Sequence, residues 1–111
     1  MRVAYSVLRE IHRKEFIPSA SDYGLKTREF ENFIFFLENR GYLERVLRVN
    51  DDFSIKIARL TKKGVELLET NKHLEETYPE RFNIKAWIQI EKLFILMEQE
   101  KNNTRKYLNT N

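Results

Sequence analysis

Apolar residues at the start of the chain recur at helical spacing. Val3, Val7, Leu8 and Ile11 lie three or four positions apart, and basic residues occupy the positions between them. Such a stripe is typical of an amphipathic helix that buries one face. Pro18 interrupts the pattern, so this first helix is expected to end before it.

Two further helices are predicted before residue 42. Ser21 or Asp22 can cap a one-turn second helix that ends at Gly24. Thr27 offers the N-cap of a third helix, which is expected to run to about Asn39 and to be stopped by Gly41. The apolar stripe of this third helix consists of Phe30, Phe33, Ile34 and Leu37.

A two-stranded ribbon and a capped helix are predicted next. Two runs rich in Val, Ile, Leu and Phe flank Asn50-Asp51-Asp52, a polar cluster suited to joining antiparallel strands. Thr61 can cap a helix that runs to Asn71. Gly64 inside this helix costs about 1 kcal/mol relative to alanine. It either packs closely against a neighbouring segment or is simply tolerated.

The last helix is predicted to span Asn83 to about Glu100, after a break at Tyr78-Pro79. Its apolar residues follow the spacing of a coiled-coil seam and cover more than one face, which favours a homodimer in which this helix pairs with its copy. Alternatively, the helix folds back across the first helix and fills the core of a monomer. The candidate dimerisation residues are Ile84, Trp87, Ile90, Phe94 and Met97.

This order of elements predicts an α+β, mostly α fold: a winged helix-turn-helix of three helices and a two-stranded β-ribbon, with additional C-terminal helices. Residues 1–72 are expected to form the winged-helix domain. Residues 73–100 are expected to form a connector and a packing or dimerisation helix. Residues 101–111 are polar and Asn-rich, which favours a disordered tail.

Three segments of the sequence together resemble a known family: residues 2–11, Phe33 to Leu37 with Arg40-Gly41-Tyr42-Leu43, and Leu60-Thr61-Lys62-Lys63-Gly64-Val65-Glu66-Leu67-Leu68. The chain is similar to the YjcQ-like winged-helix proteins of Gram-positive bacteria and their phages over residues 2 to about 90. The resemblance implies a winged-helix domain that binds DNA, and it names no operator and no effector. The segment from Leu60 is also similar to PadR-type and MarR-type regulators.

Charge permits DNA binding without requiring it. The net charge is +3, and residues 1–72 hold 14 Lys and Arg against 11 Asp and Glu. Basic and amide side chains of the third helix and the ribbon could contact bases and phosphates. The third helix and the ribbon also carry carboxylates, which repel phosphates. Two hypotheses therefore stand: a dimeric transcriptional regulator, or a protein–protein interaction module without DNA binding. The candidate DNA-binding residues are Lys26, Thr27, Arg28, Asn32, Arg45, Arg48, Lys56 and Arg59.

Motifs of catalysis and metal binding are missing from the sequence. There is no cysteine, and His12 and His73 lack the spacing of a metal site. The three glycines are isolated, so they form no phosphate-binding loop. The longest apolar run is far shorter than the roughly 20 residues of a membrane span. We therefore expect a cytoplasmic protein without enzymatic activity, cofactor, metal or membrane partner.

Overall fold

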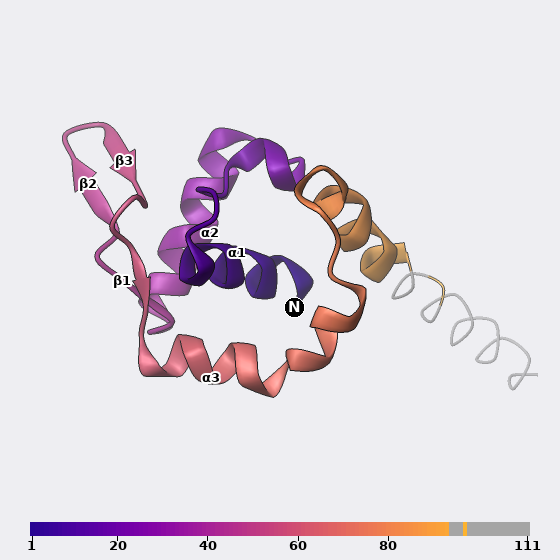
Figure 1. Cartoon of the computed structure of the whole chain (residues 1–111). Coiled ribbons are helices and arrows are strands. Elements are labelled where there is room, and N and C mark those ends of the chain that lie inside the picture. The colour runs from indigo at the N-terminus through magenta and orange to yellow at the C-terminus, as the bar shows by residue number, and fades with distance from the viewer. Residues whose placement is uncertain (94–96, 98–111) are drawn as a thin grey trace, which may run out of the picture.

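The computed structural model describes residues 1–93 and residue 97. The fold is α+β and mostly helical, which confirms the predicted class (Figure 1). Two short antiparallel strand pairs lie between α2 and α3, and η denotes a 3-10 helix. The elements are α1 Arg2–Arg13, η1 Ala20–Tyr23, α2 Thr27–Asn39, β1 Leu43–Glu44, β2 Leu47–Val49, β3 Asp52–Ser54, β4 Arg59–Leu60, α3 Lys62–Thr70, η2 Lys72–Thr77, η3 Arg81–Asn83 and a helix over residues 84–93.

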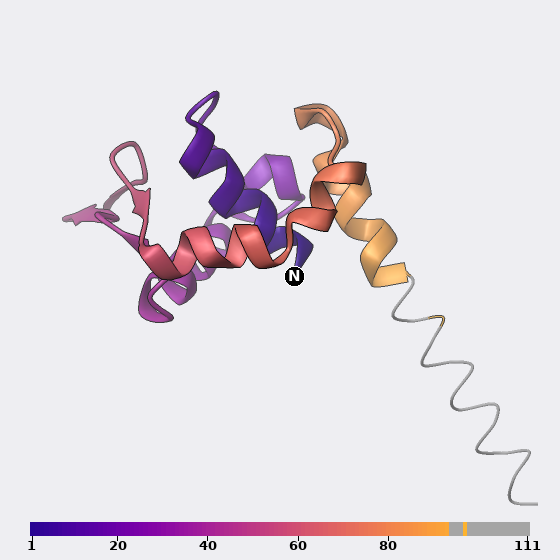
Figure 2. The same ribbon diagram turned by 60° about the horizontal axis from the view of Figure 1, so that its bottom comes forward.

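Helix α1 lies at the centre of the molecule. In Figures 1 and 2 the other helices are arranged around it, and α1 contacts both α3 and β4. Val7 and Leu8 are fully buried and Ile11 is 5% exposed, while Val3 packs at the edge of the same core. The predicted apolar stripe is therefore confirmed, and it meets Ile34 and Leu37 of α2 in one core cluster.

The N-caps of η1 and α2 differ from the prediction by one to three residues. Ser19, and neither Ser21 nor Asp22, is the N-cap of η1, and its N–H donates to the Asp22 carboxylate at 2.9 Å. Lys26 replaces Thr27 as the N-cap of α2, because the Glu29 carboxylate accepts the Lys26 N–H at 2.8 Å. Acidic side chains three residues inside each helix thus satisfy the first free N–H groups.

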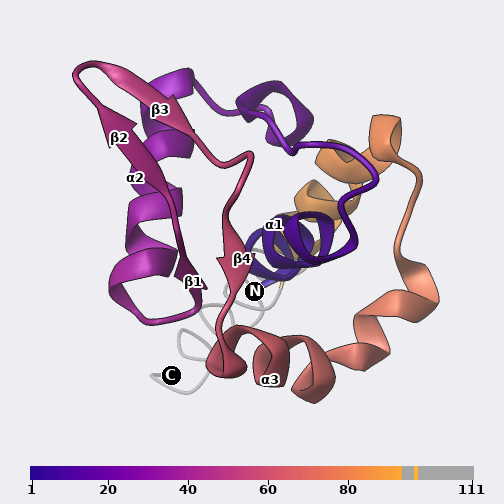
Figure 3. The same cartoon turned by 60° about the vertical axis from the view of Figure 1, so that its left-hand side comes forward.

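The ribbon consists of two separate strand pairs. β2 and β3 pair in the register Leu47↔Ser54, Arg48↔Phe53 and Val49↔Asp52, whereas β1 and β4 pair at the base through Leu43↔Leu60 and Glu44↔Arg59. Asp52, predicted in the turn, begins β3. The ladder is interrupted where Arg45 takes a left-handed backbone (φ 64°). Figures 1 and 3 show that β2 and β3 extend beside α2.

Gly64 fixes the base of the ribbon against α3. Thr61 is the N-cap of α3, as predicted, and its hydroxyl accepts the Gly64 N–H at 3.2 Å. A Cβ atom at Gly64 would lie 2.3 Å from the Tyr42 carbonyl oxygen. Close packing is thus the correct interpretation of this glycine. Helix α3 ends at Thr70, one residue before the predicted end at Asn71, and continues into η2.

The last helix begins at Ile84, one residue later than predicted, because η3 precedes it. Ile84 and Ile88 are 0% and 3% exposed and belong to the main core. Among residues 1–93 and 97, no helix is long and apolar enough to cross a membrane. Phe94, the predicted end near Glu100 and the predicted tail over residues 101–111 lie outside the described residues.

Candidate nucleic-acid interface

The outer face of α2 carries two of the candidate DNA-binding residues, one helical turn apart. Phe30 and Ile34 bury the opposite face, with exposures of 4% and 0%. Arg28 and Asn32 are exposed. Because residues four apart on a helix lie on one face, these two side chains form a short outward row beside the ribbon.

A polar groove joins this row to the tip of the ribbon. It has a volume of about 420 Å³ and brings Arg28 and Asn32 of α2 together with Arg48 of β2. Glu31 and Asp51 line the same groove. Hence three of the eight predicted DNA-binding residues converge at one place, together with two carboxylates.

Arg48 is held toward α2 by aromatic rings. Its guanidinium carbon lies 3.7 Å from the centroid of the Phe35 ring, and Phe35 meets Phe53 edge to face at 5.6 Å. Guanidinium groups stack favourably on aromatic faces. Strand residues alternate between faces, so Leu47 and Val49 occupy the other face of β2, where they are 41% and 60% exposed.

The remaining candidate DNA-binding residues are more scattered. Thr27 and Lys56 line a neighbouring, mostly apolar groove of about 470 Å³, which shares Glu31 and Phe53 with the polar groove. Lys26 is exposed at the N-cap of α2, and Arg45 is exposed near the ribbon base. Arg59 forms an ion pair with Glu44 across β1 and β4, so its charge is already partly neutralised within the chain.

The charges of the polar groove have no ion-pair partners within the described part of the chain. Neither Arg28 nor Arg48 comes within 4.0 Å of a carboxylate oxygen there, and the same holds for Glu31 and Asp51 with respect to cations. Two arginines and two carboxylates give this groove no net charge. The arginines are therefore free to pair with an external anion, and the carboxylates limit how closely a phosphate backbone can approach.

The predicted dimerisation residues of the last helix lie in two different environments. Ile84 and Trp87 are 0% and 5% exposed, and the Trp87 Nε1–H donates to Thr77 at 3.0 Å. Both side chains belong to the core of the same chain, which supports the alternative that the helix folds back. Ile90 and Met97 are 60% and 51% exposed, so among the described residues of the seam these two are the ones available to a partner.

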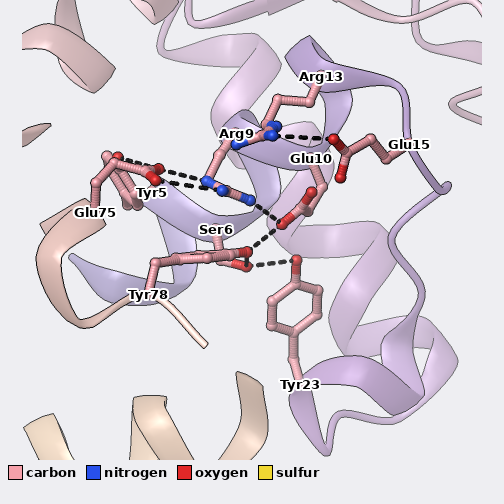
Figure 4. Close-up of polar contacts among 9 residues, drawn as sticks. All are labelled: Tyr5, Ser6, Arg9, Glu10, Arg13, Glu15, Tyr23, Glu75 and Tyr78. Atoms are coloured by element: carbon pink, nitrogen blue, oxygen red, sulfur yellow. Dashed lines mark hydrogen bonds and ion pairs between the residues drawn. The ribbon is translucent and has the colours of Figure 1, made fainter. Parts of the chain in front are cut away.

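A partly buried polar network under α1 was not predicted from the sequence. We call it the α1 cluster, and Figure 4 shows its members together with the flanking Arg13–Glu15 ion pair. Ser6 and Glu10, which are 0% and 1% exposed, lie one turn apart on α1. Segments remote in sequence supply the partners. The members are Tyr5, Ser6, Arg9, Glu10, Tyr23, Glu75 and Tyr78.

The hydroxyl groups of the α1 cluster form a directed chain. The Tyr78 O–H donates to Glu10 Oε2, so the Tyr78 oxygen accepts from Ser6, 2.9 Å away. The Ser6 oxygen in turn accepts from the Tyr23 hydroxyl at 3.0 Å. Each hydroxyl has one hydrogen to donate, so the chain ends at the carboxylate, where a full negative charge strengthens the last bond.

Burial keeps the two tyrosine hydroxyls of this chain protonated. Burial raises the pKa of Tyr23 and Tyr78, so both hydroxyls remain protonated. Burial acts to raise the pKa of Glu75 as well, but hydrogen bonds from Arg9 and Tyr5 outweigh it and lower that pKa. The Arg9 guanidinium also donates to Glu10 at 2.8 Å and lies 3.8 Å from the centroid of the Tyr78 ring.

Searches with protein-family models, among curated proteins and among solved structures found no match to this chain. The resemblance to YjcQ-like proteins, and the more distant one to PadR-type and MarR-type regulators, therefore stay predictions. The proposals below rest on the residues of the chain itself.

Proposed function

We propose that this chain is a winged helix-turn-helix protein that binds double-stranded DNA through α2 and the β2–β3 ribbon, and that it acts as a dimeric transcriptional regulator. The observation that carries the proposal is the convergence of Arg28, Asn32 and Arg48 in one exposed groove without ion-pair partners among the described residues. An unpaired guanidinium group held beside an exposed helix face suits phosphate and base contacts.

In this proposal, α2 enters the major groove. Arg28 and Asn32 face the base edges, where arginine pairs with guanine and asparagine with adenine. Arg48, which is stacked on Phe35, and Lys56 contact phosphates on the flanking backbone. Glu31 and Asp51 oppose tight binding to arbitrary sequence. We therefore expect modest affinity for non-specific DNA and a marked preference for one site.

The second part of the proposal is a homodimer through the last helix. Ile90, Leu93 and Met97 are spaced by three and four residues and are 51% to 60% exposed. An apolar stripe of this kind is buried when two copies of the helix pair. Replacing Ile90 and Leu93 with aspartate should convert a dimer into a monomer in sedimentation at micromolar concentration. Sedimentation of the unmodified chain as a monomer would exclude the dimer.

Fluorescence anisotropy tests the DNA-binding proposal directly. A labelled mixed-sequence duplex and a set of genomic fragments are titrated with protein at about 50 and 200 mM salt, a range over which phosphate contacts alter affinity strongly. The expected result is salt-sensitive binding that is tighter for some fragments than for the mixed duplex. Absence of binding at 50 mM salt would reject the proposal.

One observation favours a second candidate function, a protein-interaction module. The outer face of the ribbon exposes Leu47 and Val49, which suits an apolar partner surface better than a phosphate backbone. If DNA binding is absent, this face and the exposed stripe of the last helix become the surfaces to test.

A further inference from the structure

A cavity of about 290 Å³ lies beside the end of α1, away from the polar groove that contains Arg28 and Arg48. Its walls come from α1, from residues 14–18 and from residues 55–58, and Glu10 is part of them. Most of the lining is apolar. The apolar residues are Ile11, Phe16, Ile17, Pro18, Ile55 and Ala58.

Glu10, which is part of the cavity wall, has an unsatisfied acceptor. One of its oxygens, Oε2, accepts from Arg9 and Tyr78, as Figure 4 shows. The other, Oε1, is buried and has no hydrogen-bond donor among the described residues of the protein. A buried carboxylate oxygen without a donor is costly, because it has lost its hydrogen bonds to water without replacement. This oxygen therefore has the chemistry to bind an N–H or O–H group.

The charge balance favours a cationic donor. Within the α1 cluster, Glu10 and Glu75 share the single guanidinium of Arg9, and Glu10 is the buried one of the two carboxylates, because the Glu75 side chain is 42% exposed. Glu15, which also lines the cavity, forms an exposed ion pair with Arg13 at 2.9 Å. Lys14 and Lys56 also line the cavity, but both are exposed, so water screens their charges more strongly than it screens a buried carboxylate.

We propose that this cavity binds a small organic amine. The ammonium group donates to Glu10 Oε1, and the apolar body packs against Phe16, Ile17 and Ile55. Because Oε1 is closed off from bulk solvent, entry requires a wall side chain to move. Ile17, which is 51% exposed on a segment outside any helix or strand, is placed to do so. The site does not depend on DNA binding.

Benzylamine is the probe, and amide chemical shifts recorded by NMR are the readout. The expected result is saturable shifts of the amides of residues 16–18 and 55–58, with a Kd of about 1 mM or tighter. Benzyl alcohol, which has the same ring and a hydroxyl donor without charge, should bind about tenfold more weakly. Absence of saturation at about 10 mM benzylamine, or equal binding of the two probes, would overturn the proposal.

Variants locate the bound amine. Glu10→Gln keeps an acceptor for Tyr78 and removes the charge, so benzylamine should bind about tenfold more weakly, with the thermal unfolding midpoint measured to verify folding. If this variant fails to fold, Ile17→Trp decides: it obstructs the cavity from its exposed side and should abolish the shifts. Ile57→Trp is the control, because Ile57 is similarly exposed, at 54%, and does not line the cavity. Equal binding by both tryptophan variants would refute this location.

Discussion

The polar groove of α2 and the ribbon differs from the α1 cluster in how its charges are used, although both contain arginines beside carboxylates. In the α1 cluster, Arg9 bonds both Glu10 and Glu75. In the groove, Arg28 and Arg48 lie near Glu31 and Asp51 without an ion pair among the described residues. Glu10 is 1% exposed, and its burial favours pairing, because an unpaired buried charge costs several kcal/mol, whereas exposed charges can stay free for a partner. Substitutions in the α1 cluster should therefore change stability, and substitutions in the groove should change binding.

The largest effect is expected for Trp87, which joins the last helix to the core. Trp87→Ala should lower the free energy of unfolding by about 3–5 kcal/mol, because it removes a buried ring that packs on Tyr78 at 5.1 Å. Ile90→Ala on the exposed side of the same helix is the control and should cost less than about 1 kcal/mol at low protein concentration. Urea denaturation measures both values. Equal losses would show that the last helix has no distinct inner face.

Gly64→Ala should destabilise the protein by about 2–3 kcal/mol, even though alanine is the better helix former. The new methyl group would meet the Tyr42 carbonyl, 2.3 Å away, and push the ribbon base from α3. Glu66→Ala, at an exposed position of α3, should leave the urea midpoint nearly unchanged. A Gly64→Ala variant as stable as the unmodified chain would contradict the close approach.

Tyr78→Phe tests the hydroxyl chain of the α1 cluster. The loss of one O–H removes the donor to Glu10 and the acceptor of Ser6, so the free energy of unfolding should fall by about 1–2 kcal/mol. Tyr42→Phe is the matched control, since the Tyr42 hydroxyl makes no hydrogen bond within the described residues. Similar losses in the two variants would mean that the buried chain contributes no more than a surface hydroxyl.

The smallest effect is the pH dependence contributed by Asp22. Burial acts to raise its pKa, but hydrogen bonds from Arg81 and Ser19 outweigh burial and lower it. Because the pKa of Asp22 is lower in the folded state, its ionised carboxylate stabilises the fold at pH values above the ordinary pKa of aspartate. This contribution is lost as the pH falls through the folded-state pKa. The free energy of unfolding should fall by about 1 kcal/mol as the pH drops below about 4. This value already allows for the solvent screening of the exposed Arg81. Asp22→Asn should lack that step in urea titrations at pH 3–6, and an unchanged step would exclude Asp22 as its source.

Local patterns predicted most of the fold because their causes are local. The stripe of Val7, Leu8 and Ile11, the cap at Thr61 and the left-handed Gly24 (φ 66°) depend on neighbours within a few residues. The capping shifts to Ser19 and Lys26 arose from acidic side chains three positions inside each helix. Those acidic residues are visible in the sequence and could have corrected the prediction.

The α1 cluster could not be predicted in the same way. Glu10 meets Tyr78 across 68 positions, and Arg9 meets Glu75 across 66. The one local signal is the spacing of Ser6 and Glu10, polar residues placed on the buried and otherwise mostly apolar face of α1. Likewise, the position of Arg48 on the helix side of the ribbon depends on the ring of Phe35, a contact that strand alternation alone does not reveal.

The measurement that tests the account most directly compares two variants in two assays. Arg28→Ala with Arg48→Ala, and separately Arg9→Ala, are measured for unfolding in urea and for DNA affinity from about 50 to 200 mM salt. We predict that the double variant keeps its stability and lowers the salt slope by about 2. Arg9→Ala should lower the free energy of unfolding by about 3 kcal/mol. The salt dependence of DNA binding by the molecules of this variant that remain folded should be unchanged. A double variant with an unchanged slope, or an Arg9→Ala variant of full stability, would contradict the separation of binding charges from structural ones.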